Sequence, residues 1–419
     1  MSGPGPASGA FPYGLEFSSS PFLGTRDTNG HGTHVAGIAA GDDPVFGGVA
    51  PGAELLIIKT DFQNAHIADA VVYAFNYARS MGRPAVVNLS LGGHSDAHDG
   101  TDPLSRIIDR ESGPGRIVCC AAGNEGNDNI HALCVVPPHT TVSARFRVPA
   151  SGIRNAELNG WYAGAAALEV GVVSPGHFRT PLQAVLPAGN PLRSYPLGDA
   201  RVRVATPGPN PDNGDHQFLV DMRGPTAGTT VAAGVWKLVI KNPTAQPVTV
   251  HVWTLDDQGE QVIFTGQSVN DGFKIGSPGA AAEAITVASY TSRDTWIDAV
   301  GNTQQVGLPV GAISDFSSEG PLRSNAQKPD LMAPGAMIVA PRSSFATTRP
   351  AEQLSLTFRV MAGTSMATPY ISGIVALMLQ QNPTLTPAAI KQRLFAGCRL
   401  IGNAPGVWDP KQGHGLVQL

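Results

Sequence analysis

Hydrophobic positions follow two regular spacings in the first third of the chain. Consecutive apolar residues, typical of buried strands, occur at 54–59, 84–91 and 116–122. Between these runs, residues 67–79 and 103–111 carry apolar side chains three and four positions apart, as on one face of a helix. Alternating strands and helices predict a parallel sheet covered by helices on both faces, with functional groups at the carboxyl ends of the strands.

The middle of the chain, from about residue 130 to residue 272, has a different pattern. Helical spacing is absent, and short strand-like runs are separated by Pro and Gly. These runs are 140–148, 166–173, 217–222, 235–240 and 248–253. Many short strands with turn residues between them predict a β-sandwich. Within it, we expect residues 234–253 to form a hairpin, with Lys241-Asn242-Pro243 opening its connecting loop.

The first pattern returns after residue 272, with a further buried strand expected at 284–289. We therefore predict an α/β fold, in which a doubly wound parallel sheet is interrupted by an inserted all-β sandwich. The predicted parts are an irregular segment at 1–24, the first part of the α/β domain at 25–130, the inserted sandwich at 131–271 and the second part of the α/β domain at 272–419.

A segment without charged residues runs from 365 to 381 and is apolar on nearly all sides, as is typical of a helix in a large core. Its 17 residues would span about 25 Å, but Ser, Thr and Pro in its first turns argue against a membrane span. Ser365 would stand at the N-terminus of this helix, where free N–H groups and the helix dipole favour negative charge. It is either a plain helix cap or a poised nucleophile.

Composition narrows the classes of function. The 419 residues carry a net charge of −4 and no basic run, so nucleic acid is not expected as a partner. The four cysteines, Cys119, Cys120, Cys134 and Cys398, form neither a disulfide framework nor a metal-binding spacing. The first 30 residues show no signal peptide, and the compartment stays open.

A second chemical motif lies near the start of the chain. Residues 31–41 are expected to form a short helix of small residues, closed by Gly41, with His31 and His34 three positions apart. The pair has no HExxH pattern and no third ligand, so we predict no metal site there. Either histidine taken alone would also suit a position in the core.

Residues 29–37 (NGHGTHVAG) and 363–369 (GTSMATP) resemble the histidine and serine signatures of the subtilisin-like serine proteases. The resemblance implies that Ser365 is the nucleophile, that His31 is the general base and that His34 has a supporting role. These proteases cleave proteins or peptides, so the implied partner is a protein or peptide substrate. No cofactor is implied; structural calcium is frequent in the family, but no stretch here has convincing ligand spacing.

The resemblance extends over residues 25–130 and 272–419, with the motifs in the family's order. It implies a sheet of subtilisin type. The inserted sandwich resembles the jelly-roll insert of the clostridial germination proteases. For this insert we expect a stabilising role first and partner binding second.

The ends of two predicted strands resemble the same family. SLGG and AAGN correspond to two walls between which a substrate pairs as an added strand, and Asn124 to the side-chain donor of the oxyanion hole. The implied wall residues are Ser90, Leu91 and Gly92 on one side and Ala121, Ala122 and Gly123 on the other. Asn124 taken alone would equally be a turn residue beside glycines.

The third member of the catalytic triad has no counterpart in the sequence. The family's Asp follows an apolar strand upstream of the histidine motif, and no such stretch occurs here. Asp27 lies within the histidine motif, at a position that is not the triad member in relatives. Asp42 and Asp43 lie beyond the far end of the His31 helix, about 15 Å away. We expect an N-terminal segment missing from this sequence, or a separate chain, to supply the carboxylate, since the sheet would otherwise lack an inner strand.

Two functions follow from this pattern. The first is a serine endopeptidase that acts through an acyl-enzyme on Ser365. The second is a pseudoprotease, a non-enzymatic binding scaffold, or an inactive fragment, because the triad Asp is not found. An α/β-hydrolase esterase would need a G-x-S-x-G elbow and a histidine late in the chain, and neither is present. Helical settings for His31 and Ser365 argue against a chymotrypsin-like barrel.

Overall fold

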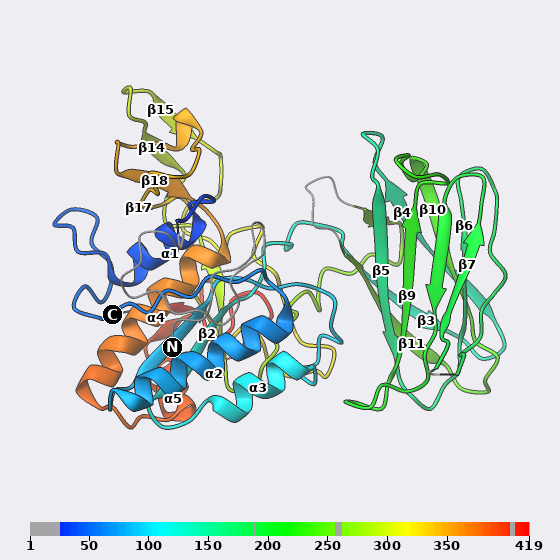
Figure 1. The fold of residues 1–419 in the computed structure, drawn as a ribbon, viewed down its shortest axis with the longest axis horizontal. Helices are drawn as coiled ribbons and strands as arrows, with labels where there is room; N and C mark the ends of the chain where they lie inside the picture. Colours follow the sequence, from blue (N-terminus) through cyan, green and yellow to red (C-terminus); the bar gives the residue numbers. More distant parts are fainter. Residues whose placement is uncertain (1–25, 188, 256–261, 403–406, 419) are drawn as a thin grey trace, which may run out of the picture.

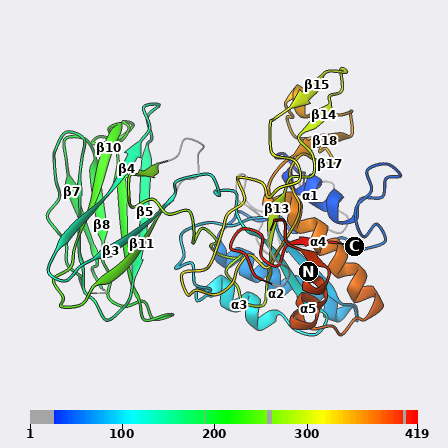
Figure 2. The ribbon, with the colours of Figure 1, turned by 180° about the vertical axis from the view of Figure 1, so that it is seen from behind.

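The computed structural model describes residues 26–187, 189–255, 262–402 and 407–418. An α/β body and a β-sandwich lie side by side, as views from opposite sides show (Figures 1 and 2). The predicted combination of a parallel sheet with additional antiparallel sheets is confirmed. In the described part of the chain, no helix is both long and apolar enough to cross a lipid bilayer.

The central sheet of the α/β body has the strand order β1-β2-β13-β16-β20-β19. Its strands are β1 (Ala85–Leu89), β2 (Arg116–Ala121), β13 (Ile285–Tyr290), β16 (Leu331–Pro334), β20 (Leu416–Val417) and β19 (Cys398–Arg399). Neighbours from β1 to β20 are parallel, and β19 is antiparallel to β20. β2 pairs directly with β13, so the sandwich that separates them in sequence does not interrupt the sheet.

Helices cover both faces of this sheet. They are α1 (His31–Ala40), α2 (Asn64–Ser80), α3 (Pro103–Glu111), α4 (Thr364–Gln381) and α5 (Pro387–Ala396). Ile117 and Cys119 of β2 pack with α4 and α5, whereas Val118 and Cys120 pack with α2 and α3. Successive strand residues point to opposite faces, which is why all four side chains are buried.

The uncharged helix α4 passes through the core, as its sequence predicts. Helix α1 lies against its first turns, with Val35 and Ile38 packed on Met366. Close approach depends on a small residue, since a Cβ built on Gly373 of α4 would lie 3.0 Å from the Ala39 carbonyl oxygen of α1 and 2.5 Å from Val49. The N-termini of α1 and α4, which carry the histidine and serine motifs, thereby belong to one packed unit.

The strand predicted at 54–59 is not formed. The segment is extended but unpaired, and its four aliphatic side chains are 40–63% exposed. Its ends are fixed, because Glu54 forms an ion pair with Arg83 just before β1, and Lys59 Nζ donates to the Arg26 carbonyl 3.2 Å away. Among the described residues β1 pairs with β2 alone, so its other edge is unpaired. In the part of the chain that the structure describes, no strand lies between that edge and segment 54–59 to connect the segment to the sheet.

The sandwich consists of two antiparallel sheets with orders β12-β4-β10-β6 and β3-β11-β5-β9-β8-β7. The strands are β3 (His131–Val136), β4 (Thr141–Val148), β5 (Asn155–Tyr162), β6 (Glu169–Val173), β7 (Leu192–Pro196), β8 (Arg201–Ala205), β9 (His216–Arg223), β10 (Gly234–Lys241), β11 (Val248–Leu255) and β12 (Ile263–Thr265). Side chains from both sheets, including Phe146, Trp236 and Phe218, form one solvent-inaccessible core.

The hairpin predicted at 234–253 is wrong. Both strands form, but β10 pairs with β4 and β6, whereas β11 pairs with β3 and β5 in the opposite sheet. Asn242 explains the crossing, because its buried side-chain amide donates to the carbonyls of Val136 (3.0 Å) and Gln246 (2.7 Å). The connection is thereby fastened to the end of β3 and carries the chain from one sheet to the other.

Two short hairpins stand above α1 and the start of α4 (Figure 1). They pair β14 (Thr295–Ile297) with β15 (Thr303–Gln305) and β17 (Ile338–Pro341) with β18 (Phe358–Met361). Between β17 and β18 lies a short 3-10 helix, Pro350–Glu352. Strand β18 leads directly into the serine motif, so this hairpin positions the start of α4.

Candidate active site

Ser365 occupies the first turn of α4, at the position that its sequence predicts. The chain enters the helix through Gly363, whose φ of +154° is one that residues with side chains rarely adopt. Ser365 is half-buried, and its Oγ donates to the carbonyl of Ser90 at 3.3 Å, while Ser90 Oγ donates to the carbonyl of Ser365 at 2.8 Å. These two bonds fix the start of α4 to the carboxyl end of β1.

Asn124 lies at the same helix N-terminus. Its Oδ1 accepts a hydrogen bond from the Thr364 N–H at 2.8 Å and lies 3.0 Å from Thr364 Oγ1. The carboxamide oxygen therefore satisfies one of the free N–H groups of α4. Asn124 is exposed, and its Nδ2 has no partner among the described residues. The amide consequently keeps two N–H donors for an acceptor outside the protein, next to the turn that holds Ser365.

The wall residues lie after two adjacent parallel strands. Ser90, Leu91 and Gly92 follow β1, Ala121 ends β2, and Ala122 and Gly123 follow it. The two segments differ in access. Gly92 is exposed, whereas Ala122 is buried and its N–H donates to the Val287 carbonyl at 3.1 Å. Of the second wall, the half-buried Gly123 lies nearest to solvent and next to Asn124.

His31 is the first residue of α1, preceded by Gly30 in the left-handed conformation (φ +89°). The Asp27 carboxylate caps this helix, accepting from the N–H of Gly30 and of Thr33 (both 2.7 Å) and from Thr33 Oγ1 (2.8 Å). It makes no hydrogen bond to the His31 ring. Among the described residues no hydrogen bond joins His31 to Ser365 either, so the packing of α1 on α4 brings the two helix ends together without forming that bond.

Burial lowers the pKa of His31 below its usual value, with Asp27 opposing and Arg359 adding to the shift. Arg359 is buried on β18 and paired with Glu352. Its guanidinium lies beside the start of α1, 3.2 Å from the position that a Cβ on Gly30 would take. His31 is therefore a neutral imidazole over a wider pH range than an exposed histidine, which suits a proton acceptor.

His34 is buried one turn further along α1, and its Nε2 lies 3.1 Å from the carbonyl of Ile338. This contact ties α1 to β17. Burial lowers the pKa of His34 to about 4, so the ring is neutral near neutral pH. Among the described residues, no group of three His, Cys, Asp or Glu side chains is placed to hold a metal ion.

The two charges beside His31 predict opposite shifts. Asp27→Asn keeps an oxygen to cap α1 but removes the negative charge, and will lower the pKa of His31. Arg359→Met removes the positive charge and will raise it. Histidine NMR titration measures both shifts, with the His31 signal assigned by its loss in His31→Gln. Shifts of the same sign in both variants would contradict this account.

Two residues that sequence reasoning missed organise the segment after Asn124. Glu125 accepts from the Asn124 N–H at 2.8 Å and from Ser318 Oγ at 2.8 Å. Burial opposes its ionisation, but His94 and these hydrogen bonds hold the pKa of Glu125 at about 2. The GNEG sequence gives no sign of this role, because Ser318 lies 193 positions away.

Lys274 binds the backbone of the segment that follows Asn124. Its side chain is fully buried, and Nζ donates to the carbonyls of Glu125 (3.0 Å), Gly126 (2.8 Å) and Asp128 (3.3 Å). Glu319 Oε1 lies 3.9 Å away. A single lysine in a polar stretch carries no sequence signal for such a cage, because the carbonyls come from backbone 146–149 positions away.

Comparison with known proteins shows which family this chain resembles. The model of the subtilase family matches residues 19–156 and 225–415. Subtilisin-like protease SBT1.6 of Arabidopsis thaliana is 27% identical over 404 residues, which is 91% of this chain and 50% of that protein. Serine protease AprX of Bacillus subtilis (strain 168) is 35% identical over 138 residues, 32% of this chain and 29% of AprX. The chain thus spans half the length of the plant relative.

A solved structure shares the arrangement of both bodies. The CspB protease of Clostridium perfringens superposes with a TM-score of 0.75 at 24% identity, covering 93% of this chain and 79% of that one. This likeness concerns the fold, and it fits the resemblance of the inserted sandwich to that of clostridial proteases. The segment between the two stretches matched by the family model, 157–224, lies within the sandwich.

Proposed function

Because the chain belongs to the subtilase family, we propose that it is a serine endopeptidase in which Ser365 is the nucleophile and His31 the general base. Ser365 Oγ attacks the peptide carbonyl while His31 takes its proton, and His31 then returns the proton to the leaving amine. Water hydrolyses the acyl-enzyme by the reverse route. The chemistry needs no cofactor.

One observation carries this proposal: the serine and an amide with unused donors lie at the same helix N-terminus. Ser365 is in the first turn of α4, and Asn124 binds the N–H of the preceding residue, Thr364, through its oxygen alone. The carbonyl oxygen of a substrate attacked by Ser365 would become negative next to the Asn124 N–H groups and the Ser365 N–H. Fixed donors at such a point are the largest single contribution to many acyl-transfer reactions.

A protein or peptide substrate would lie extended between the two walls, with Ser90, Leu91 and Gly92 on one side and Ala121, Ala122 and Gly123 on the other. Exposed Gly92 offers backbone groups for such pairing. On this reading, residues 25–130 and 272–419 form the catalytic domain and residues 131–271 are an insertion, with 1–24 outside it.

The missing carboxylate is proposed to arrive on an added strand. Two observations favour this: β1 has one unpaired edge among the described residues, and the apolar segment 54–59 is exposed with its ends fixed near β1 and α1. A strand between them would pair with both and bury Leu55 to Ile58. An N-terminal segment or a separate polypeptide would serve, and its aspartate would orient His31.

A non-enzymatic scaffold is the second candidate function. It is favoured by the commitment of Asp27 to capping α1 and by the absence of a His31–Ser365 hydrogen bond among the described residues. A scaffold would use the same walls to hold a peptide without cleaving it.

Labelling by a fluorophosphonate probe, which reacts with activated serines, distinguishes the two. We would compare the chain alone, the chain joined or mixed with a strand that ends in aspartate, and the Ser365→Ala and His31→Ala variants of each. The carboxylate is expected to raise the labelling rate by about 10⁴, the loss seen when a triad carboxylate is replaced by an amide. The adduct should map to Ser365.

Labelling that persists in Ser365→Ala would place the reactive serine elsewhere. If the folded, carboxylate-bearing form remains unlabelled, the protease function is wrong and the scaffold takes its place. Circular dichroism of every form shows whether it is folded, so that loss of labelling through misfolding is distinguished from loss of activity.

A further inference from the structure

The junction between the α/β body and the sandwich is built around five neighbouring rings, which we call the ring column: His94, His98, Trp253, His131 and His251. His98 stacks on Trp253, whereas His94 lies edge to edge with His98, and His131 with His251, through their ring nitrogens. His98 lies on Trp253 with ring centroids 3.8 Å apart, His131 lies 4.8 Å from Trp253, and His94 lies 5.2 Å from His98. His94 and His98 follow β1, whereas the other three rings come from β3 and β11. The column therefore spans the two bodies.

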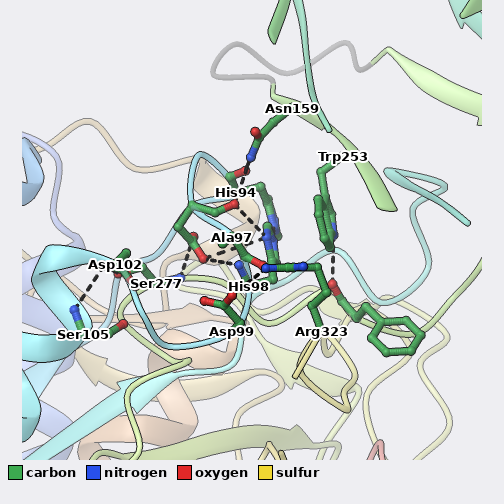
Figure 3. A network of polar contacts seen from close by, with 12 residues as sticks. His94, Ala97, His98, Asp99, Asp102, Ser105, Asn159, Trp253, Ser277 and Arg323 are labelled. Atoms are coloured by element: carbon green, nitrogen blue, oxygen red, sulfur yellow. Dashed lines mark hydrogen bonds and ion pairs between the residues drawn. The ribbon is translucent and has the colours of Figure 1, made fainter. Parts of the chain in front are cut away.

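Hydrogen bonds hold the His94–Asp99 loop from both sides (Figure 3). Asn159 of β5 donates to the carbonyls of His94 (2.8 Å) and Asp96 (2.9 Å). Arg323 donates to the Ala97 carbonyl at 2.7 Å and pairs with Asp99 and with Asp215 of the sandwich. This loop is thus seated on the sandwich through specific polar contacts as well as stacking.

The same loop reaches the candidate active site through Glu125. His94 Nε2 lies 3.5 Å from Glu125 Oε2, and that oxygen accepts the Asn124 N–H at 2.8 Å. On its other side, His94 Nδ1 lies 2.9 Å from His98 Nε2. Since a carbonyl only accepts, His98 Nδ1 donates to the Asp96 carbonyl 3.2 Å away, so His98 Nε2 accepts from His94 Nδ1. The contact of His94 Nε2 with the Glu125 carboxylate then requires a hydrogen on that nitrogen as well. An unbroken path runs from Trp253 through two rings and one carboxylate to the backbone of Asn124.

We propose that His94 and Glu125 are positioning residues. Through them, the placement of Asn124 depends on the contacts between the sandwich and the His94–Asp99 loop. His94 lies between His98 and Glu125, so a displaced sandwich would release Glu125 and with it the Asn124 N–H. The consequence for catalysis rests on the proposed peptidase function. The structural dependence itself does not.

The buried histidines of the ring column and the charges around them make the contact between the sandwich and the His94–Asp99 loop sensitive to low pH. Burial lowers the pKa of His98 far below its usual range, that of His131 to about 3 and that of His251 to about 4. The titratable and charged groups that face the column are Asp96, Asp99, Asp102, Asp215, Glu125, Arg323 and Lys274. A proton on His98 Nε2 would set two donors, His94 and His98, against each other.

The sign of the pH dependence follows from these shifts. An unfolded histidine binds a proton near pH 6.5 whereas these buried rings do not, so their contribution to stability is complete above about pH 6.5 and declines below it. Asp96 acts in the opposite direction, because burial, and then Asp102, raises its pKa to about 7, and its contribution grows as the pH falls from 7 towards 3.8. Three histidines against one carboxyl leave a net loss in acid.

Hydrogen exchange of the peptide that covers residues 121–126 tests the dependence without requiring activity. In His94→Gln and in Trp253→Leu we expect this peptide to exchange about tenfold faster than in the wild type, while β4 and β10 keep their protection. Glu125→Ala should behave in the same way, and Glu125→Gln, which keeps an acceptor for Asn124, should restore most of the protection. His66→Gln on α2 is the matched control and should change nothing.

Reaction with the fluorophosphonate probe gives the second readout. His94→Gln should slow labelling of Ser365 about tenfold and lower kcat with little change in KM, because it disturbs Asn124 and leaves the substrate walls in place. Protection of residues 121–126, corrected for the intrinsic effect of pH, should also fall below about pH 6.5.

Unchanged exchange of residues 121–126 in both His94→Gln and Trp253→Leu would overturn the proposal, as would protection of this peptide, corrected for intrinsic exchange, that stays constant from about pH 7.5 to 5. If no form of the protein reacts with the probe, the peptidase function fails, while the exchange measurements still decide whether Asn124 depends on the sandwich. Loss of protection throughout β4 and β10 would mean that the sandwich itself unfolds, which the milder Glu125→Ala variant avoids.

Discussion

Asn124→Asp will lower kcat by about 10²–10³ while leaving the start of α4 intact, because a carboxylate keeps the capping acceptor and loses both N–H donors. Its oxygen can still accept from the Thr364 N–H, and a negative charge at a helix N-terminus is favourable. The same charge repels the oxyanion that forms when Ser365 attacks. Stability and activity are thereby separated in one substitution.

Asn127→Asp is the matched control, since Asn127 is an exposed residue of the same loop. It should leave kcat within about twofold of the wild type. Both variants would be assayed for kcat and KM on a peptide substrate with the carboxylate-bearing form, and for thermal unfolding. A wild-type kcat in Asn124→Asp would remove Asn124 from the oxyanion hole.

Lys274→Met will cost about 3–5 kcal/mol of unfolding free energy, the range observed when one partner of a buried charged group is removed. Methionine fills a similar volume, but the carbonyls of Glu125, Gly126 and Asp128 lose their donor inside the protein. Burial lowers the pKa of Lys274 below its usual value, and the nearby Glu319 opposes this shift only in part. The buried ammonium is therefore stabilised mainly by the carbonyls that surround it. The segment after Asn124 should therefore loosen first.

Lys241→Met makes the same chemical change at a half-buried ion pair with Glu169 near the protein surface and should cost about 1 kcal/mol, well below the cost at Lys274. Chemical denaturation followed by circular dichroism compares the two variants, and hydrogen exchange of residues 124–128 localises the effect. Equal stabilities would mean that the cage contributes nothing.

The exposed segment 54–59 and the unpaired edge of β1 both indicate a place where an additional strand would bind. Four aliphatic side chains are exposed where the sequence predicts a buried strand, and β1 has a single neighbour among the described residues. Exposed apolar residues beside an unpaired strand edge form a surface that another strand would cover. The proposed carboxylate-bearing strand would complete the sheet and the triad in one step.

Several features of this protein follow from the sequence alone, because they depend on neighbours along the chain. The helical spacing at 67–79 and 103–111 gives α2 and α3, and the uncharged segment after Gly363 gives α4 with Ser365 in its first turn. The change of pattern near residue 130 predicts a sandwich, which the two antiparallel sheets confirm. The motifs around His31 and Ser365 carry the resemblance to the family to which the chain belongs.

Other features were decided only by tertiary structure. Residues 234–253 have the pattern of a hairpin, yet β10 and β11 lie in opposite sheets because Asn242 is fastened to the end of β3. Residues 54–59 have the pattern of a buried strand, yet a strand exists only where a partner edge is present. Lys274 carries no sequence signal for its cage of carbonyls, and the same holds for the ring column. Pairing and burial of this kind join residues far apart in the chain, so local spacing does not reveal them.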